Sequence, residues 1–344
     1  MNEKSISTTQ PDGDRAWVAR LAQYEKPRRW KAIGQLANTL LPYLGIWAGM
    51  IVLIRAGVST WAIGVLTLPA AALLIRVFIL FHDCCHGSLF ASHRANRVIG
   101  LMTGVLTFTP YEAWRRSHAG HHTTAGDLDR RGTGDVWTLT VREYARASRA
   151  TRLAYRVYRH PLFMFGFGPI VSFMIMPRIP SRQSLRQRRV LQNTLWTDLW
   201  IAGFAVAVSL AFGVRTYLMI QLPVLWLAAA GGIWLFYVQH QFPGVRWVRH
   251  GQWDRIRSAL EGSSYYHLPR PLRWVTGDIG LHHIHHLRAR IPNYRLQECY
   301  NDTPQAQRIA PLTLRRSLAC LRLRLWNEDT QRLVGFRDLP ANGP

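Results

Sequence analysis

Nine of the fourteen histidines in this 344-residue chain lie in three compact clusters. Within each cluster the histidines are spaced at i and i+4, or at i, i+3 and i+4, so on a helix their rings would share one face. Imidazole nitrogen is a good ligand for iron, copper, zinc and nickel. We therefore predict a metal site built from the clusters at His82–His86, His118–His122 and His282–His286.

The number of histidines limits the kind of metal site. A structural zinc needs only four ligands, and a haem uses one or two axial histidines. The clustered histidines are too many for one metal and suit two. No phosphate loop, nucleotide-binding glycine fingerprint or nucleophile elbow offers a competing chemistry. Isolated histidines are usually hydrogen-bonded core or surface residues, which is our interpretation of His93, His160, His250 and His267.

Long uncharged runs must position these clusters. There are four such runs. The first, second and fourth runs each have 20 or more residues, which is enough for a helix to cross a hydrocarbon core of roughly 30 Å. The third run is shorter. His240 directly follows the fourth run, so we expect it near the same membrane surface as the clusters. The runs are Ile33–Ile54, Ala56–Ile75, Leu199–Val214 and Thr216–Gln239.

The formal charge of +24 is explained by where the Lys and Arg residues lie. They number 7 in residues 1–32, 17 in residues 82–194 and 16 in residues 241–344, whereas the two short gaps between paired runs carry one each. By the positive-inside rule, both termini and the middle segment are cytoplasmic. No nucleic-acid-binding module is visible, so we expect no nucleic-acid partner.

These patterns predict an all-α integral membrane protein with four transmembrane helices in two hairpins and a cytoplasmic helical cap that carries the metal site. We expect Val98–Tyr111 and Pro161–Met176 to be interfacial or half-buried helices on the cytoplasmic side rather than membrane spans. The expected regions are a cytoplasmic segment 1–32, hairpin 33–81, a cytoplasmic or interfacial region 82–194, hairpin 195–240 and a cytoplasmic region 241–344.

The text around the histidines resembles a known family. HDCCH, HAGHH and HHIHH, together with HHTTAGDLDRRGTGDVW, FYVQHQFPGVRW and GSSYYHLPRPLRWVTGDIGL, are similar to the membrane fatty acid desaturases. The resemblance is to the acyl-lipid branch, and it is particularly close to the phospholipid desaturases of bacilli. It covers roughly residues 70–300. A bacterial inner-membrane location follows from it.

The resemblance implies a di-iron centre held by histidine. The residues that match the family's ligands are His82, His86, His118, His121, His122, His240, His282, His285 and His286. His283 is an extra histidine, which we expect beside the ligands. A ligating imidazole usually donates its other N–H to a carboxylate or carbonyl. We expect Asp83, Asp278 and Asp129 to accept such bonds, with Asp127 as a weaker candidate.

The implied reaction uses O₂ to insert a cis double bond into the acyl chain of a membrane lipid. Two electrons must come from an external donor such as a ferredoxin or flavodoxin, because the chain has no flavin, haem or iron–sulfur motif. Trp114, Trp234 and Tyr237 are candidates for lining the acyl channel, although interface anchoring or packing is the commoner role of such aromatics. The oligomeric state, the double-bond position and the lipid carrier stay open.

Two alternatives share some of these features. A di-iron membrane hydroxylase or ketolase acting on alkanes, carotenoids or sterols would use the same histidine clusters. A histidine-rich metal transporter or sensor would place its polar ligands at mid-membrane depth. Here the uncharged runs contain no histidine before their cytoplasmic ends, which disfavours a transporter.

Overall fold

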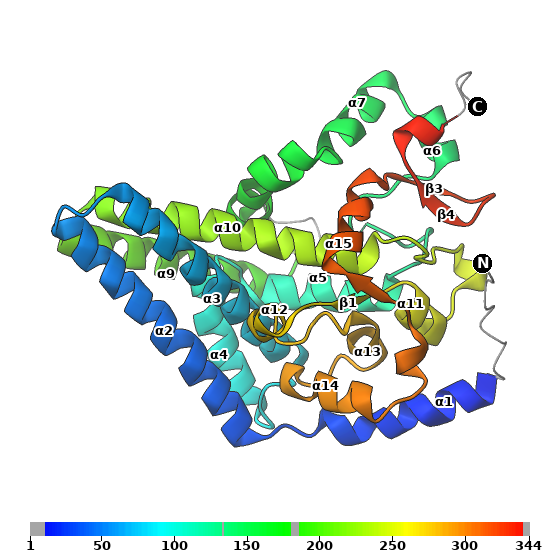
Figure 1. The fold of residues 1–344 in the computed structure, drawn as a ribbon, viewed down its shortest axis with the longest axis horizontal. Helices are drawn as coiled ribbons and strands as arrows, with labels where there is room; N and C mark the ends of the chain where they lie inside the picture. The colour runs from blue at the N-terminus through cyan, green and yellow to red at the C-terminus, as the bar shows by residue number, and fades with distance from the viewer. Residues whose placement is uncertain (1–10, 133, 180–185, 340–344) are drawn as a thin grey trace.

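The computed structural model describes residues 11–132, 134–179 and 186–339, and it is mostly helical (Figure 1). Within these residues, four helices are long and apolar enough to cross a membrane. They extend from the body of the molecule and converge at a narrow tip on the left of Figure 1. The four are α2 (Arg29–Arg55), α3 (Thr60–His86), α9 (Arg188–Phe212) and α10 (Val214–His240).

The helices are longer than the uncharged runs that predicted them. α3 continues without a break from the apolar run through the first histidine cluster, as expected, and α10 ends on His240. α9 begins at Arg188, well before Leu199, because the charged residues that end a membrane span are compatible with helix. α3 is thus a rigid connection between the membrane segment and the histidines.

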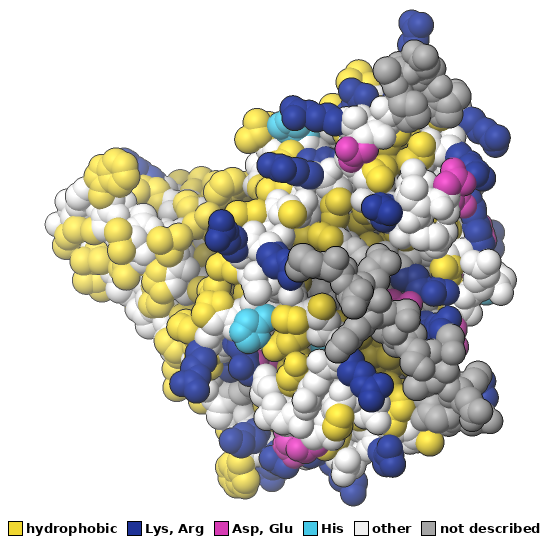
Figure 2. Space-filling view, turned by 45° about the vertical axis from the view of Figure 1, so that its right-hand side comes forward, with side chains coloured by type: hydrophobic (Ala, Val, Ile, Leu, Met, Phe, Trp, Pro, Cys, Tyr) yellow, Lys and Arg dark blue, Asp and Glu magenta, His cyan; other side chains and the backbone are white. Residues whose placement is uncertain are grey.

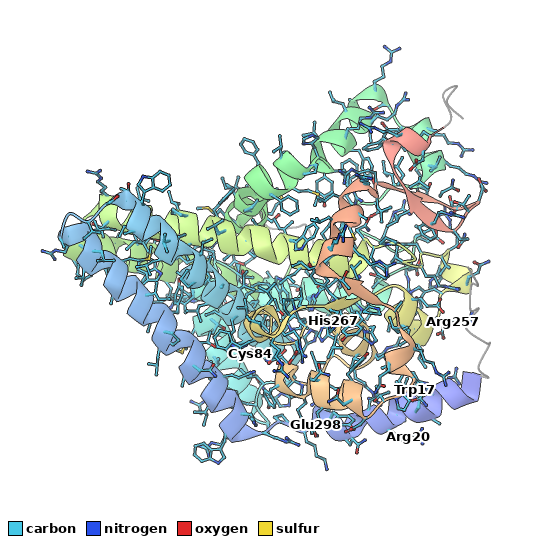
Figure 3. All side chains as sticks on the ribbon, viewed as in Figure 1. Trp17, Arg20, Cys84, Arg257, His267 and Glu298 are labelled. Atoms are coloured by element: carbon cyan, nitrogen blue, oxygen red, sulfur yellow. The ribbon has the colours of Figure 1, made fainter. Side chains whose placement is uncertain are left out.

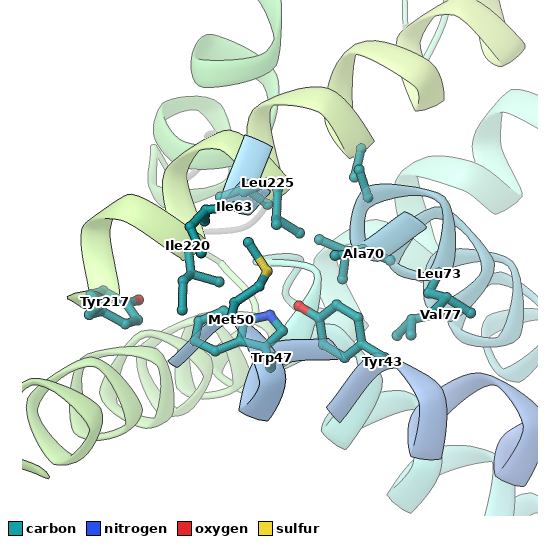
Figure 4. Close-up of a cluster of buried hydrophobic side chains, with 14 residues drawn as sticks. Tyr43, Trp47, Met50, Ile63, Ala70, Leu73, Val77, Tyr217, Ile220 and Leu225 are labelled. Atoms are coloured by element: carbon teal, nitrogen blue, oxygen red, sulfur yellow. The ribbon is translucent and has the colours of Figure 1, made fainter. Parts of the chain in front are cut away.

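The membrane helices pack through a shared core between α2, α3 and α10 (Figure 4). Trp47 and Met50 of α2 meet small side chains such as Ala70 of α3 and the branched side chain of Ile220 from α10. Apolar burial gives little driving force between helices in lipid, so close van der Waals fit at small residues must hold them together. These contacts fix α10 against α3.

Arg76 joins the membrane helices to the body. It is buried within α3, where its Nε donates to Thr39 Oγ1 of α2 at 3.1 Å. Its guanidinium also donates to the carbonyl of Trp274 and lies 4.2 Å from the centre of that indole. Trp274 belongs to α12 (Arg270–Val275), so one charged side chain connects three helices. These contacts explain why α3 carries a charged residue between apolar ones.

Two helices follow α3 and return the chain to the histidines. They are α4 (His93–Leu106) and α5 (Tyr111–Thr124). The predicted interfacial helix Val98–Tyr111 is therefore wrong in its bounds, because Phe108 adopts a positive φ of 56° and Pro110 precedes α5. α4 lies against α3, with Gly100 and Gly104 at the contact.

The segment between the two pairs of long helices is bent. α7 (Arg149–Tyr158) is followed by π-helical turns at Phe163–Phe167 and Ile170–Ile175. Taken together, the two parts of this stretch are long and apolar enough to span a membrane, but they meet at a bend of 64°. The prediction that Pro161–Met176 is interfacial stays a prediction.

The remaining elements form the body. They include α1 (Pro11–Arg20), α6 (Val141–Arg146), α11 (Arg255–Glu261), α13 (His282–Leu287), α14 (Asn293–Asn301) and α15 (Leu314–Ser317). Two pairs of three-residue strands accompany the helices in this mostly helical fold. β1 (Tyr265–His267) pairs in parallel with β2 (Pro311–Thr313), and β3 (Leu325–Asn327) pairs antiparallel with β4 (Arg332–Val334).

The surface of the four long helices differs in composition from the surface of the body. Figure 2 shows apolar side chains crowded over the arm that holds the four long helices, whereas Lys and Arg side chains are spread over the body. An apolar surface of this extent is unusual for a protein in water and normal for one in lipid. The four apolar helices indicate a membrane protein.

Glycine contacts give a test of the α3–α4 packing. A Cβ at Gly104 would lie 2.6 Å from the carbonyl oxygen of Thr109 and 3.1 Å from the Phe81 ring. We expect Gly104→Ala to lower the free energy of unfolding by about 1–3 kcal/mol through overpacking. Thermal unfolding in detergent measures this. Gly64→Ala in α3 is the control, because nothing lies within 4 Å of its new Cβ; an equal loss in both variants would contradict the packing described.

Candidate metal centre

Nine histidine side chains from four helices meet in the body of the molecule and form two adjacent groups. Within each group, one ring nitrogen from every member lies within 4.8 Å of those of the others. Among the residues that the structure describes, no carboxylate or thiolate belongs to either group. The first group is His82, His86, His118, His122 and His285; the second is His121, His240, His282 and His286.

The second and third histidine clusters each contribute rings to both groups. The sequence had predicted instead that all rings of one cluster would share one face of their helix. Successive residues on a helix turn by about 100°, so i and i+4 differ by about 40° while i+3 and i+4 differ by about 100°. His118 and His122 therefore face the first group, and His121 faces the second. In α13 the i, i+4 pair His282 and His286 face the second group, whereas His285 turns to the first.

The ring nitrogens approach closely within each group. In the first group, His285 Nε2 lies 3.1 Å from His82 Nε2 and 3.0 Å from His122 Nε2. In the second group, His240 Nε2 lies 3.0 Å from the Nε2 atoms of both His121 and His282. Nitrogens from helices far apart in sequence thus converge on two small volumes.

Packing around the groups holds the helices in place. Below α13, Ile284 and Leu287 are buried against Leu296 of α14 and Trp17 of α1. On the other side, Cys84 lies in a separate core with Phe81 and Tyr111. Figure 3 shows Cys84 near the middle of the molecule and Trp17 on α1. The histidines of α3 and α13 are therefore carried by rigid, buried elements.

Burial and neighbouring rings favour the uncharged form of several of these histidines. Burial lowers the pKa of His118, His122, His285 and His286 well below the ordinary value, and the neighbouring imidazoles lower the pKa further. A neutral imidazole has one nitrogen lone pair free to bind a cation. His86 Nε2 is buried and has no hydrogen-bond partner among the described residues. An inward-facing orphan nitrogen within an all-imidazole donor set fits a metal ion, and iron is among the metals that suit such donors.

Three hydrogen-bond acceptors orient histidine rings of the two groups through the Nδ1 atoms. Asp135 Oδ1 lies 2.6 Å from His121 Nδ1, and both side chains are almost fully buried. Asp83 Oδ1 lies 3.3 Å from His82 Nδ1, and the Gly262 carbonyl oxygen lies 3.2 Å from His240 Nδ1. A proton held on Nδ1 leaves Nε2 free for a metal, which is the usual role of such partners.

Comparison with known proteins decides what kind of protein carries this centre. The model of the family described as fatty acid desaturase matches residues 59–314. The chain belongs to the fatty acid desaturase family. A fatty acid desaturase of Bacillus subtilis is 42% identical over 351 residues, covering 100% of this chain and 97% of the relative. The resemblance predicted from the histidine clusters is confirmed, and the protein is an oxidoreductase by family.

More distant relatives are desaturases as well. A probable fatty acid desaturase of Sorghum bicolor is 30% identical and covers 71% of this chain and 64% of the relative. An sn-1 acyl-lipid omega-3 desaturase (ferredoxin) of Synechocystis is 25% identical and covers 74% of this chain and 70% of the relative. These relatives give no support to the hydroxylase or ketolase alternative.

Of the acidic residues predicted to orient ligands in this desaturase, Asp83 contacts a histidine of the two groups. Its other oxygen accepts two bonds from Asn293 of α14, from the backbone N–H and the side-chain amide. Asp278 instead pairs with Arg273 at 2.7 Å. Asp129 pairs with Arg249 and accepts the backbone N–H of His250.

Asp127 also lies outside the centre, because the chain turns away after α5. It accepts from Arg130 and lies 2.7 Å from His250 Nδ1. His283 is fully buried beside the rings of Tyr265 and Tyr300 and belongs to neither metal group. The predictions for Asp278, Asp129 and Asp127 therefore do not fit the contacts that these side chains make.

The three predicted channel aromatics of the desaturase lie in different environments. The Trp114 ring stacks on His118 with centroids 4.2 Å apart, so it borders the first group. Trp234 donates from Nε1 to Tyr266 Oη at 3.2 Å. Tyr237 donates to the carbonyls of Cys320 and Leu323, and Arg159 lies over its ring. These bonds direct Tyr237 to the C-terminal segment, which argues against a channel role.

Sequence reasoning missed Asp135, Phe236 and the Gly262 carbonyl. Asp135 lies 14 residues after His121 in a loop, so no helical period connects the two. Phe236 lies one turn before His240, and its ring centre lies 5.3 Å from that of His121. That helical spacing was the one available signal. A backbone carbonyl has no sequence signal.

The contact between Asp135 and His121 gives a specific prediction. Asp135→Asn should weaken metal binding by about 10–100-fold, because the amide no longer favours a proton on His121 Nδ1. Chelator titration of the purified protein, read as metal content, measures the loss. Asp129→Asn is the matched control, since Asp129 bonds to Arg249 and not to the centre. Equal metal retention in both variants would refute the orienting role of Asp135.

Proposed function

We propose that this protein is a di-iron, O₂-dependent desaturase that inserts a cis double bond into the acyl chain of a membrane lipid. The observation that carries the proposal is the pair of adjacent, largely buried, all-imidazole groups within a member of the fatty acid desaturase family. Two groups suit two metal ions. The acyl-lipid relatives support a lipid-bound substrate rather than a free one.

The protein's own residues would hold and shield the irons. The nine histidines are the proposed ligands, and Asp83, Asp135 and the Gly262 carbonyl would fix their tautomers. Bound iron would supply the O₂-derived oxidant that removes two hydrogens from adjacent methylenes, chemistry beyond any side-chain acid or base. Phe236 and Trp114 would keep water from the reacting carbon.

We propose that α2–α3 and α9–α10 are two transmembrane hairpins, joined by residues 56–59 and by Gly213. The rest of the chain would form a cap on the cytoplasmic side of a bacterial inner membrane, with both termini there. The regions are those expected above, at 1–32, 33–81, 82–194, 195–240 and 241–344. The distribution of Lys and Arg supports this orientation.

An external protein would deliver the electrons. The name of the Synechocystis relative includes ferredoxin, and the present chain carries a formal charge of +24. An acidic donor of the ferredoxin or flavodoxin kind would be attracted to such a body at a rate that falls with salt. Trp114 and Trp234 are retained as proposed channel residues, since one borders the metal centre and the other lies on α10.

Single histidine substitutions test the centre. His121→Ala and His285→Ala remove one proposed ligand from each group and should abolish new unsaturation in a host that expresses the protein. Gas chromatography of total fatty acids, with double-bond positions assigned, is the measurement. His250→Ala serves as the control because His250 lies outside both groups. Full activity in either ligand variant would show that the assignment is wrong.

Metal content is a separate test. Protein purified in active form should contain about two irons per chain, because each group offers more than the three protein ligands of a catalytic metal. Elemental analysis measures both the amount and the identity of the metal. Active protein with one iron per chain, or with zinc in place of iron, would contradict the di-iron proposal.

A further inference from the structure

Asn293, the first residue of α14, connects that helix to the first histidine group. Its backbone N–H and its side-chain amide both donate to Asp83 Oδ2 of α3, at 2.7 Å and 2.9 Å. The other oxygen of Asp83 lies 3.3 Å from Nδ1 of His82. All three side chains are buried. A short polar chain, closed to water, therefore leads from α14 to one of the proposed ligands.

The two bonds from Asn293 fix the direction in which the Asp83 carboxylate points. A carboxylate can turn about its terminal bond, and either of its oxygens can accept. Two donors on Oδ2 hold that oxygen toward α14, so Oδ1 is left to face His82. Among the described residues, His82 is also the only ion-pair contact of Asp83. The orientation of the carboxylate thus depends on Asn293.

The Asn293 side chain is itself held from two sides. Its Oδ1 accepts from Nε2 of Gln35 in α2 at 2.7 Å, and Figure 1 shows α14 close to the start of α2. Gly277 lies against the amide, because a Cβ at Gly277 would be 3.2 Å from Asn293 Cγ. An ionised carboxylate only accepts, so the amide must turn its NH₂ toward Asp83 and its carbonyl toward Gln35.

The second histidine group has a separate support of the same kind. Asp135 Oδ1 lies 2.6 Å from His121 Nδ1, while Asp135 Oδ2 accepts the backbone N–H of Gly132 at 3.1 Å. Among the described residues, no hydrogen bond joins this pair to Asn293 or to Asp83. A change at Asn293 should therefore reach the first group and leave the second as it is.

We propose that Asn293 is a positioning residue for the first histidine group. Through Asp83 it keeps a proton on His82 Nδ1, which leaves His82 Nε2 free where it faces Nε2 of His285. The inference rests on the proposed di-iron function and adds a residue to which no histidine spacing points. If Asp83 served only to cap the start of α14, loss of the amide would affect both groups alike or neither.

Removal of the Asn293 amide tests the proposal. Asn293→Leu keeps the branched shape of the side chain, and Asn293→Ser gives the same test if the leucine variant does not fold. The full-length protein in detergent is loaded with ferrous iron without oxygen, and chelator titration measures how tightly each iron is held. We expect one iron to be held about tenfold less tightly and the other to be unchanged.

Gln297→Met is the matched control, because Gln297 lies one turn further along α14. Its side chain contacts Arg273 and Asn301 rather than Asp83. Both irons should be held in this variant as tightly as in the wild type. A tenfold loss at one iron in the control would show that any change in α14 has this effect, and it would overturn the specific role of Asn293.

Double variants show whether Asn293 acts through Asp83. In protein that carries Asp83→Asn, the further change Asn293→Leu should cause no additional loss, because the shared contact is already removed. In protein that carries Asp135→Asn, the two losses should fall on different irons. Unchanged binding in Asn293→Leu, equal weakening of both irons, or additive losses with Asp83→Asn would each overturn the proposal. Wild-type protein that binds fewer than two irons would instead refute the proposed di-iron function.

Discussion

The structure depends on keeping the nine imidazoles of the two groups turned toward two points. Two ring nitrogens 3.0 Å apart can share at most one proton, and two facing lone pairs repel each other. A cation between them turns that repulsion into attraction, and protons then compete with it for the same nitrogens. The closely packed side chains behind the rings keep water out and prevent each imidazole from turning away.

The membrane helices serve this geometry as supports. α3 is continuous from the apolar core to His86, so the first histidine cluster is fixed relative to the bilayer. Arg76 anchors α12 to α3, and Asp83 links α3 to Asn293 of α14. Each link is a buried polar contact whose loss would leave an unsatisfied partner, which is costly away from water. The body is thereby held in one position above the membrane segment.

The features predicted from sequence are those with a local cause. Uncharged length gives a spanning helix, and i, i+4 spacing gives two rings on one side, so α3, α10 and the pair His118 and His122 follow from nearby residues alone. The hydrogen-bond partner of His121 could not be predicted from nearby residues, because Asp135 lies in a loop with no periodic relation to the helix of His121. The partner of Asp278, Arg273, did not follow for a related reason: adjacency in sequence to a cluster does not tell which nearby arginine a carboxylate will meet. The pairing of β1 with β2 depends on residues far apart in the chain and leaves no periodic signal.

The division of single helical turns between the two histidine groups has a consequence for the separation of those groups. His121 and His122 are bonded neighbours that point into different groups, and His285 and His286 repeat the arrangement. The spacing of the two groups along these helices thus follows from helix pitch rather than from loop length. Insertions in the surrounding loops can leave that spacing unchanged. A one-residue insertion within α5 would instead turn the following rings by about 100°, away from the points that they now face.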